Sequence, residues 1–133
     1  MKHSDWQTRL RDYLRSISRT PYVIGQHDCA TFTAGAVEAM TGADYMHGLR
    51  GYRTIAEGMR MAKEHGFDDH IAVVAASFEE CHPAFAQVGD IAVLDGEGGD
   101  ALGIVQGAHV YCIGTNGLGT VPLTHIKRAF RIG

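Results

Sequence analysis

The fold of this sequence is decided by the segment Gly25-Gln26-His27-Asp28-Cys29-Ala30. A loop that contains glycine leads to an aspartate able to cap a helix, and a cysteine follows at the first helical position. Free backbone N–H groups and the positive end of the helix dipole lie there, and both favour a thiolate over a thiol. The same N–H groups can stabilise an oxyanion during acyl transfer. The segment therefore predicts a nucleophile, Cys29, at a helix N-terminus.

A competing interpretation treats Cys29 as a small apolar packing residue, which is the ordinary role of an isolated cysteine on a helix. Its helix is expected to run to Gly42, which supplies the C-terminal stop. Residues on the same stripe are apolar, namely Phe32, Ala36, Val37 and Met40. The surroundings of the helix must decide between the two interpretations.

Helices are also expected on both sides of this segment. Ser4 and Gln7 have the spacing of a capping box, and apolar residues at helical spacing follow as far as residue 17. A further helix is predicted from Thr54, with Glu57 as its capping partner, to Gly66. The apolar run 71–77 fits either a buried strand or a short helix.

Short apolar runs separated by glycine-containing turns dominate the chain after Pro83, at 91–94, 102–105, 109–113 and 120–121. Such runs predict an antiparallel meander. The tail, 126–132, is expected to add an edge strand or to pack across the sheet. Because helices come first and strands second, the predicted class is α+β, in a single domain over residues 1–133.

This order of elements resembles the NlpC-type cysteine hydrolases of the papain-like clan. The stretch Gly89-Asp90-Ile91 resembles that family's Gly-Asp-Leu strand, and Leu102-Gly103-Ile104-Val105 resembles its next strand. The motif Gly-x-x-Asp-Cys-Ala and the tail 128–132 resemble uncharacterised phage and prophage proteins. The resemblance runs from about residue 21 to the end, and it implies N-terminal helices packed on a C-terminal meander.

The resemblance also implies catalytic positions that this chain leaves without polar side chains. The family's general-base histidine would fall on Ala101, and the residue that orients it would fall near Ile113. A cysteine hydrolase needs a base within reach of the thiol. By the family's own positions, the chain has the nucleophile alone.

Two histidines are candidates to replace the missing base. His27 precedes Cys29 by two residues, and His109 begins the strand after the one that should carry the base. Asp100 lies beside the vacant position and is a candidate to bind a water or a cation. Candidate binding residues beside the thiol are Asp28, Tyr22 and Tyr52, with Phe32 more suited to the core.

Composition excludes several functional classes. A net charge of −3 gives no general attraction to nucleic acid, and the arginines at 9, 11, 15 and 19 are expected to form a solvated helix face. No apolar run approaches the roughly 20 residues needed to span a bilayer, and no signal peptide is apparent, so a cytoplasmic location, or one in a phage particle, is expected. The odd number of cysteines favours free thiols. Pairs such as Cys81-His82 and His109-x-x-Cys112 lack the spacing of zinc modules, so no metal or other cofactor is predicted.

Three functional hypotheses follow. The first is a phage- or prophage-associated protein on an NlpC-like scaffold, weakly active or inactive, with phage structural proteins or peptidoglycan peptides as partners. The second is an active peptidase or amidase on peptidoglycan-type peptides that uses Cys29 with His27 or His109. The third is a thiol- or metal-dependent binding protein.

Overall fold

The computed structural model describes residues 2–96 and 98–133, and within them six strands form one antiparallel sheet. The strand order is β1-β6-β2-β3-β4-β5. The strands are β1 (Glu80–Cys81), β2 (Ile91–Gly96), β3 (Gly99–Gln106), β4 (His109–Gly114), β5 (Gly117–Pro122) and β6 (Arg128–Phe130). The helices are α1 (Trp6–Ser16), α2 (Cys29–Thr41), α3 (Ile55–Glu64) and α4 (His70–Ser77). The fold is α+β, as the order of elements in the sequence predicts.

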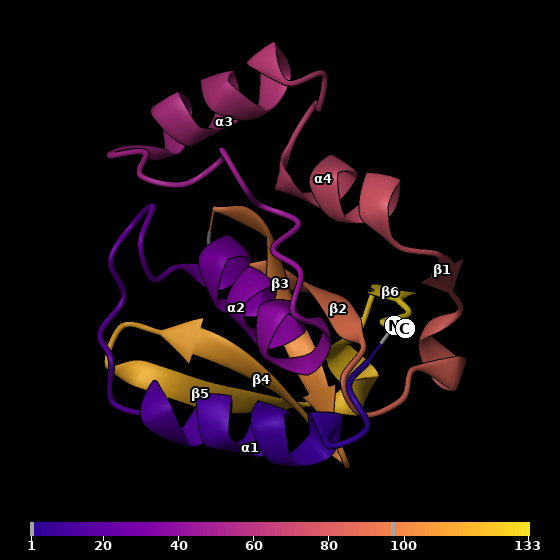
Figure 1. Cartoon of the computed structure of the whole chain (residues 1–133). Helices are drawn as coiled ribbons and strands as arrows, with labels where there is room; N and C mark the ends of the chain where they lie inside the picture. Colours follow the sequence, from indigo (N-terminus) through magenta and orange to yellow (C-terminus); the bar gives the residue numbers. More distant parts are fainter. Residues whose placement is uncertain (1, 97) are drawn as a thin grey trace.

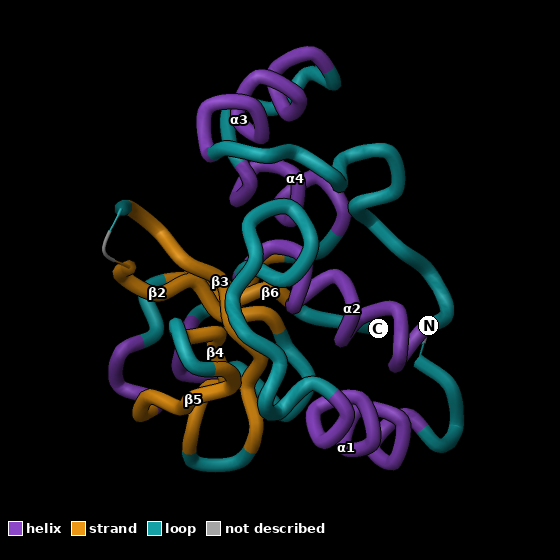
Figure 2. Tube along the Cα trace, turned by 90° about the vertical axis from the view of Figure 1, so that its left-hand side faces the viewer, coloured by secondary structure: helices purple, strands orange, loops and turns teal. Residues whose placement is uncertain are grey.

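Helices α1 and α2 cover one face of the sheet (Figures 1 and 2). Helix α2 lies between α1 and the strands and is buried on nearly every side; Phe32 and Met40 are fully buried within it. The hydroxyl of Tyr13 in α1 donates to the backbone oxygen of Phe32 at 2.9 Å. Burial of this kind is the main source of stability in a small domain. It holds the N-terminal end of α2 in a fixed place against β3.

The other face of the sheet carries a smaller apolar cluster. Its buried members are Ala92, Leu94, Val105 and Val110. Leu102 and Ile104, at alternate positions of β3, belong instead to the large core beneath α2. The period of two along a strand therefore assigns each β3 side chain to one face.

Helices α3 and α4 form an arm beyond one end of the sheet, and α3 lies farthest from the strands (Figures 1 and 2). In α3 only Ala62 is buried, and 67% of Ile55 is exposed. Helix α4 is anchored better, with Ile71, Val73 and Val74 in the core. The arm thus presents apolar side chains that are not packed into the core.

Several sequence-based expectations are corrected at this point. The capping box at Ser4 and Gln7 is wrong, because α1 begins at Trp6 with Asp5 at its N-cap, and no side chain caps it. Of the two structures left open for the run 71–77, a buried strand or a short helix, the helix is the one observed. The tail strand β6 is not an edge strand, because it pairs with both β1 and β2. The cap residues of the two central helices, Asp28 and Thr54, are confirmed.

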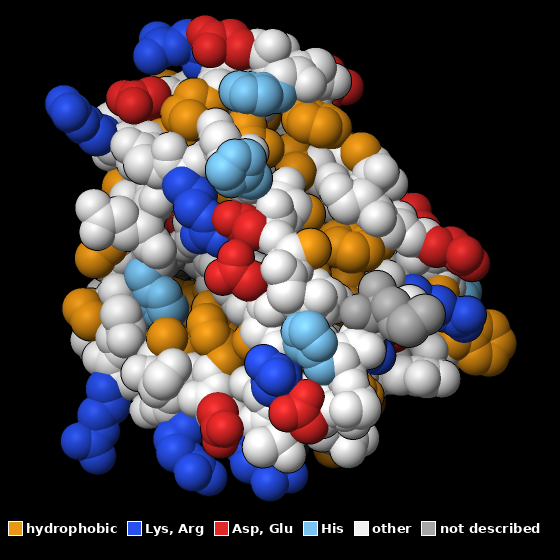
Figure 3. All heavy atoms as spheres, in the orientation of Figure 1, with side chains coloured by type: hydrophobic (Ala, Val, Ile, Leu, Met, Phe, Trp, Pro, Cys, Tyr) orange, Lys and Arg blue, Asp and Glu red, His pale blue; other side chains and the backbone are white. Residues whose placement is uncertain are grey.

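The arginines at positions 9, 11, 15 and 19 are exposed, as expected of a solvated face. Figure 3 shows the corresponding cluster of basic side chains along its lower rim, where α1 lies. In the part of the chain that the structure describes, no helix is long and apolar enough to cross a membrane.

Candidate functional site: the thiol groove

Cys29 is the first residue of α2, and a closed hydrogen-bond network fixes the turn before it. Asp28, the N-cap, accepts from the backbone N–H of Thr31 at 2.9 Å, and the Thr31 hydroxyl accepts from the Asp28 N–H at 2.8 Å. The second carboxylate oxygen of Asp28 accepts from the N–H of Gly25 at 2.9 Å and from the hydroxyl of Tyr52 at 2.5 Å. The Thr31 hydroxyl also donates to the first carboxylate oxygen at 3.0 Å, so this buried carboxylate has four donors and is fully satisfied. The network holds the start of α2 rigidly.

The loop before Cys29 requires glycine at position 25. Gly25 has a φ of +77°, and a Cβ placed there would lie 1.9 Å from the backbone oxygen of Tyr52. Its carbonyl also accepts from the N–H of Gly51 at 3.1 Å. The loop and the segment around Tyr52 are therefore in backbone contact, which only glycine allows. This contact brings the Tyr52 ring to Asp28.

The thiol of Cys29 is half-buried, and it lines a groove. Burial raises its pKa, and the Asp28 carboxylate adds to the effect, while the backbone N–H groups of Leu102, Ala30 and Cys29 itself act in the opposite direction. The net shift is upward, so the sulfur carries its proton at neutral pH. The expected stabilisation of a thiolate by the helix start is thus outweighed by loss of solvent.

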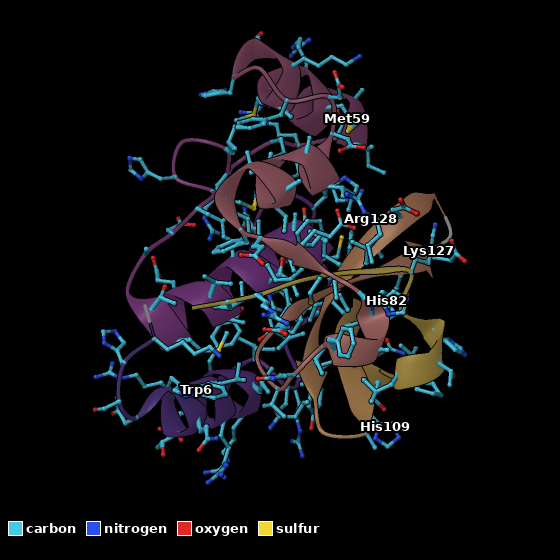
Figure 4. The ribbon with its side chains drawn as sticks, turned by 90° about the vertical axis from the view of Figure 1, so that its right-hand side faces the viewer. Trp6, Met59, His82, His109, Lys127 and Arg128 are labelled. Atoms are coloured by element: carbon cyan, nitrogen blue, oxygen red, sulfur yellow. The ribbon has the colours of Figure 1, made fainter. Side chains whose placement is uncertain are left out.

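The groove has a volume of about 1060 Å³ and extends from the N-terminal end of α2, beneath the α3–α4 arm, to the β2–β3 hairpin. We call it the thiol groove. Its wall on the arm side is mostly apolar and includes Met46, Leu49, Ile55 and Met59. Figure 4 shows Met59 on the underside of the arm, across from the sheet. Such a mixture of an apolar wall and a few polar groups is typical of a ligand site.

The sheet wall of the groove lacks the polar side chains that the resemblance places there. Ala101 and Ile113 both line the groove, and neither has a titratable group. Ala101 pairs with Leu94, which belongs to the cluster on the far face, so its Cβ points away from α2. The β3 side chain on the face of α2 is Leu102. Neither position 101 nor position 113 therefore carries a side chain that could act as a base or orient one.

The structure does not bring the two candidate histidines to the groove. His109 is exposed at the start of β4, and its cross-strand partner is Gln106, at the far end of β3. Figure 4 shows His109 and Met59 at opposite ends of the molecule. His27 is buried, its ring Nε2 has no hydrogen-bond partner within the described residues, and burial lowers its pKa. Neither side chain is among those that line the groove.

A different histidine, His70, does line the groove. It is the first residue of α4, and its Nε2 lies 2.7 Å from the backbone oxygen of Asp100. No role for His70 follows from the sequence. Its only local signal is Asp69, which caps α4 through the N–H of Ala72 at 2.8 Å, but a cap does not reveal which strand a helix will face.

The remaining candidate residues from the sequence differ in whether they line the groove. Tyr22 and Tyr52 both line the groove, whereas Phe32 is a core residue. The Asp100 carboxylate is paired with Lys127 at 2.6 Å, which lowers its pKa and occupies it. Among the described residues, no group of three or more His, Cys, Asp or Glu side chains is arranged to hold a metal ion.

The fold is similar to that of NlpC/p60 domains. The NlpC/p60 domain of the peptidoglycan hydrolase SagA is similar, with a TM-score of 0.61, 16% identity, and 96% of this chain and 99% of that chain covered. An NLP/P60-family protein similar to a lipoprotein, from Staphylococcus aureus, gives a TM-score of 0.57 at 17% identity, over 99% of this chain and 43% of that one. RipD from Mycobacterium tuberculosis, described as a non-catalytic NlpC/p60 domain protein adapted to peptidoglycan binding, gives 0.56 at 12% identity, over 98% and 100%.

The chain belongs to the family described as a domain of unknown function, DUF6950, whose model matches residues 1–132. No curated protein matches it. The likenesses to solved structures therefore show the fold, and the function rests on the groove.

Proposed function

We propose that this protein is a peptide-binding domain on the NlpC/p60 scaffold, with weak or no hydrolase activity. The observation that carries the proposal is the contrast within the thiol groove. The Asp28 network that positions the helix start is complete, whereas Ala101 and Ile113 supply no base from the sheet. Binding needs the groove alone, but acyl transfer also needs a base.

The ligand class we propose is a peptidoglycan-type peptide. Two of the similar structures come from a peptidoglycan hydrolase and from a protein adapted to peptidoglycan binding. The groove offers an apolar wall for small side chains, and Tyr22 and Tyr52 as walls beside the thiol. We further propose a place in a phage or prophage particle or in the cytoplasm, on the resemblance of the Gly-x-x-Asp-Cys-Ala motif to phage and prophage sequences.

Calorimetry with a synthetic peptidoglycan stem pentapeptide tests the binding proposal. We expect measurable binding by the wild-type protein and equal affinity, within threefold, for Cys29→Ala. A matched variant, Met59→Glu, places a charge on the apolar wall and should weaken binding at least tenfold. Absence of binding to the wild-type protein would refute the proposal.

The particle proposal has its own test. Deletion of the gene from a prophage that encodes this protein should reduce the yield of intact particles, and a Cys29→Ala copy should restore it. An unchanged yield after deletion refutes the particle role. Restoration by the wild-type copy alone refutes a non-catalytic role in the particle.

A further inference from the structure

A second cavity lies between α1 and the strands β3, β4 and β5, and Figure 1 shows α1 running alongside β4 and β5. Two arginines of α1, Arg11 and Arg15, line one side of it, and Gln106, Tyr111 and Leu118 line the other. Its volume is about 340 Å³, which is at the lower end of the range of small-molecule sites. We call it the arginine cavity. Among the described residues, none lines both this cavity and the thiol groove.

Backbone contacts hold the two sides of the arginine cavity together. The N–H of Leu118, in β5, donates to the carbonyl oxygen of Ser18, just beyond α1, at 3.2 Å. Gly117 lies so close that a Cβ there would be 2.7 Å from the same oxygen. The carbonyls of Tyr13 and Arg15 also accept hydrogen bonds, from the N–H groups that follow the helix. The carbonyls at the end of α1, which would otherwise repel an anion, are therefore occupied.

The sheet side of the arginine cavity has a buried amide at a position that faces inward. Leu102 and Ile104 of β3 belong to the large core, and Gln106 is the next residue of the strand on that face. The Oε1 atom of Gln106 is buried, and it has no hydrogen-bond partner within the described residues. A buried acceptor without a donor costs free energy. A ligand that brings a donor to this oxygen would recover that cost.

The helix side of the arginine cavity supplies positive charge. Arg11 and Arg15 are one turn apart on α1, so their side chains leave the same face of the helix. Both are exposed, and neither forms an ion pair within the described part of the chain, whereas Arg9 is paired with Asp5 at 2.7 Å. Two guanidinium groups without a carboxylate partner are a donor set suited to a carboxylate or a phosphate group.

We propose that the arginine cavity binds the free C-terminal end of a peptide. The terminal carboxylate accepts from Arg11 and Arg15, the N–H of the last residue donates to Oε1 of Gln106, and a small apolar side chain packs against Leu118. Peptide ends carry an anion and a donor on the two sides of one carbon atom, whereas a phosphate diester has the anion without the donor. The site is separate from the thiol groove, so the inference does not rest on the proposed function.

NMR titration of the isotope-labelled protein with N-acetyl-alanyl-alanine tests the proposal on the wild-type chain. Two analogues each remove one feature: the C-terminal amide lacks the charge, and N-acetyl-alanyl-lactate has an ester oxygen in place of the N–H. We expect the dipeptide to shift the backbone signals of Gln106, Tyr111 and Leu118, and each analogue to bind at least tenfold more weakly. Absence of binding at millimolar dipeptide, or equal binding of either analogue, overturns the proposal.

Variants of the lining residues locate the ligand. Arg15→Gln and Gln106→Met should each weaken binding of the dipeptide at least tenfold, and Gln106→Met should leave binding of the lactate analogue within twofold. Arg19→Gln is the matched control, because it removes the same charge from an exposed arginine that does not line the cavity. An equal loss in Arg19→Gln would mean attraction by net charge alone and overturns the proposal.

A second control separates the two cavities. Met59→Glu alters the thiol groove only, so we expect it to keep dipeptide binding within twofold of the wild-type value. A tenfold loss in this variant would place the dipeptide in the thiol groove and overturn the inference. Inorganic phosphate is titrated in parallel, and binding as tight as that of the dipeptide would show a site for any anion, which also overturns it.

Discussion

The two walls of the thiol groove differ in how completely their polar groups are used. On the α2 wall, Asp28 accepts four hydrogen bonds and joins the helix start, the Gly25 loop and Tyr52 into one unit. On the sheet wall, the two positions where the resemblance places the base and its orienting residue carry Ala101 and Ile113, and the Asp100 carboxylate is already paired with Lys127. The difference teaches that positioning of the thiol and transfer of its proton are separable properties of this scaffold. The position of the thiol is fixed by α2, whereas transfer of its proton depends on the side chains of the opposite wall.

A side chain at position 25, where Gly25 contacts the Tyr52 backbone, should destabilise the α2 wall more than any other change considered. Gly25→Ala should lower the free energy of unfolding by about 3–4 kcal/mol, because it combines a positive φ with overlap of two backbones. Gly48→Ala is the matched control: its φ is +82°, but a Cβ there meets nothing within 4 Å. It should cost about 1–2 kcal/mol. Urea denaturation measures both, and equal losses would show that overlap at Gly25 does not occur.

The two aspartate caps provide a comparison of the next size. Asp28→Ala should lower the free energy of unfolding by about 2–3 kcal/mol, because it strands the buried N–H of Gly25 and the hydroxyl of Tyr52. Asp69→Ala removes a cap with a single acceptor contact and should cost about 1 kcal/mol. The same denaturation experiment compares them. A smaller loss for Asp28→Ala than for Asp69→Ala would contradict the network described for the α2 wall.

Alkaline pH should lower the free energy of unfolding, because buried tyrosines resist ionisation in the folded protein. Burial raises the pKa of Tyr13 to about 12. Burial also raises the pKa of Tyr45 and that of Tyr52. The Asp28 carboxylate raises the pKa of Tyr52 further. In the unfolded chain these groups ionise near pH 10. The contribution of these protonated tyrosines to the free energy of unfolding is therefore complete below pH 10, and it is lost as the pH rises toward 12.

Urea denaturation at pH 8, 9, 10 and 11 checks this dependence. The wild-type free energy of unfolding should decline above pH 10, and Tyr13→Phe should decline less steeply although it is less stable at pH 8. A free energy that rises or stays level between pH 10 and pH 11 would be the contrary result.

Much of this fold could be predicted from local signals in the sequence. The caps at Asp28 and Thr54 and the left-handed Gly42 stop are properties of a few adjacent residues, and the structure has all three. The short apolar runs separated by glycine-containing turns likewise predicted the meander. What local signals do not contain is pairing between distant segments: β6 beside β2, or the backbone contact between Gly25 and Tyr52.

The site was predictable only in part for the same reason. The position of Cys29 follows from its own helix, and its apolar neighbours on the sheet follow from the resemblance. His70 is 41 positions away in the sequence, and it meets β3 only because α4 packs over the end of the sheet. The upward shift in the pKa of Cys29 also depends on burial, which no motif encodes. Long-range packing therefore decides the chemistry of a thiol that local sequence places.

The smallest expected effect comes from restoring the histidine at the position that the resemblance indicates. Ala101→His should leave the rate of Cys29 alkylation at pH 7 within twofold, because residue 101 shares the face of Leu94 rather than that of α2. Mass spectrometry of the Cys29 peptide gives the rate, and Leu94→His, on the same face, is the matched control. A rise of tenfold or more in Ala101→His alone would mean that the side chain reaches the thiol around the strand edge. The backbone of the sheet wall would then be able to place a base beside the thiol, and only the histidine side chain at position 101 would be missing. The contrast between the two walls would reduce to a single substitution.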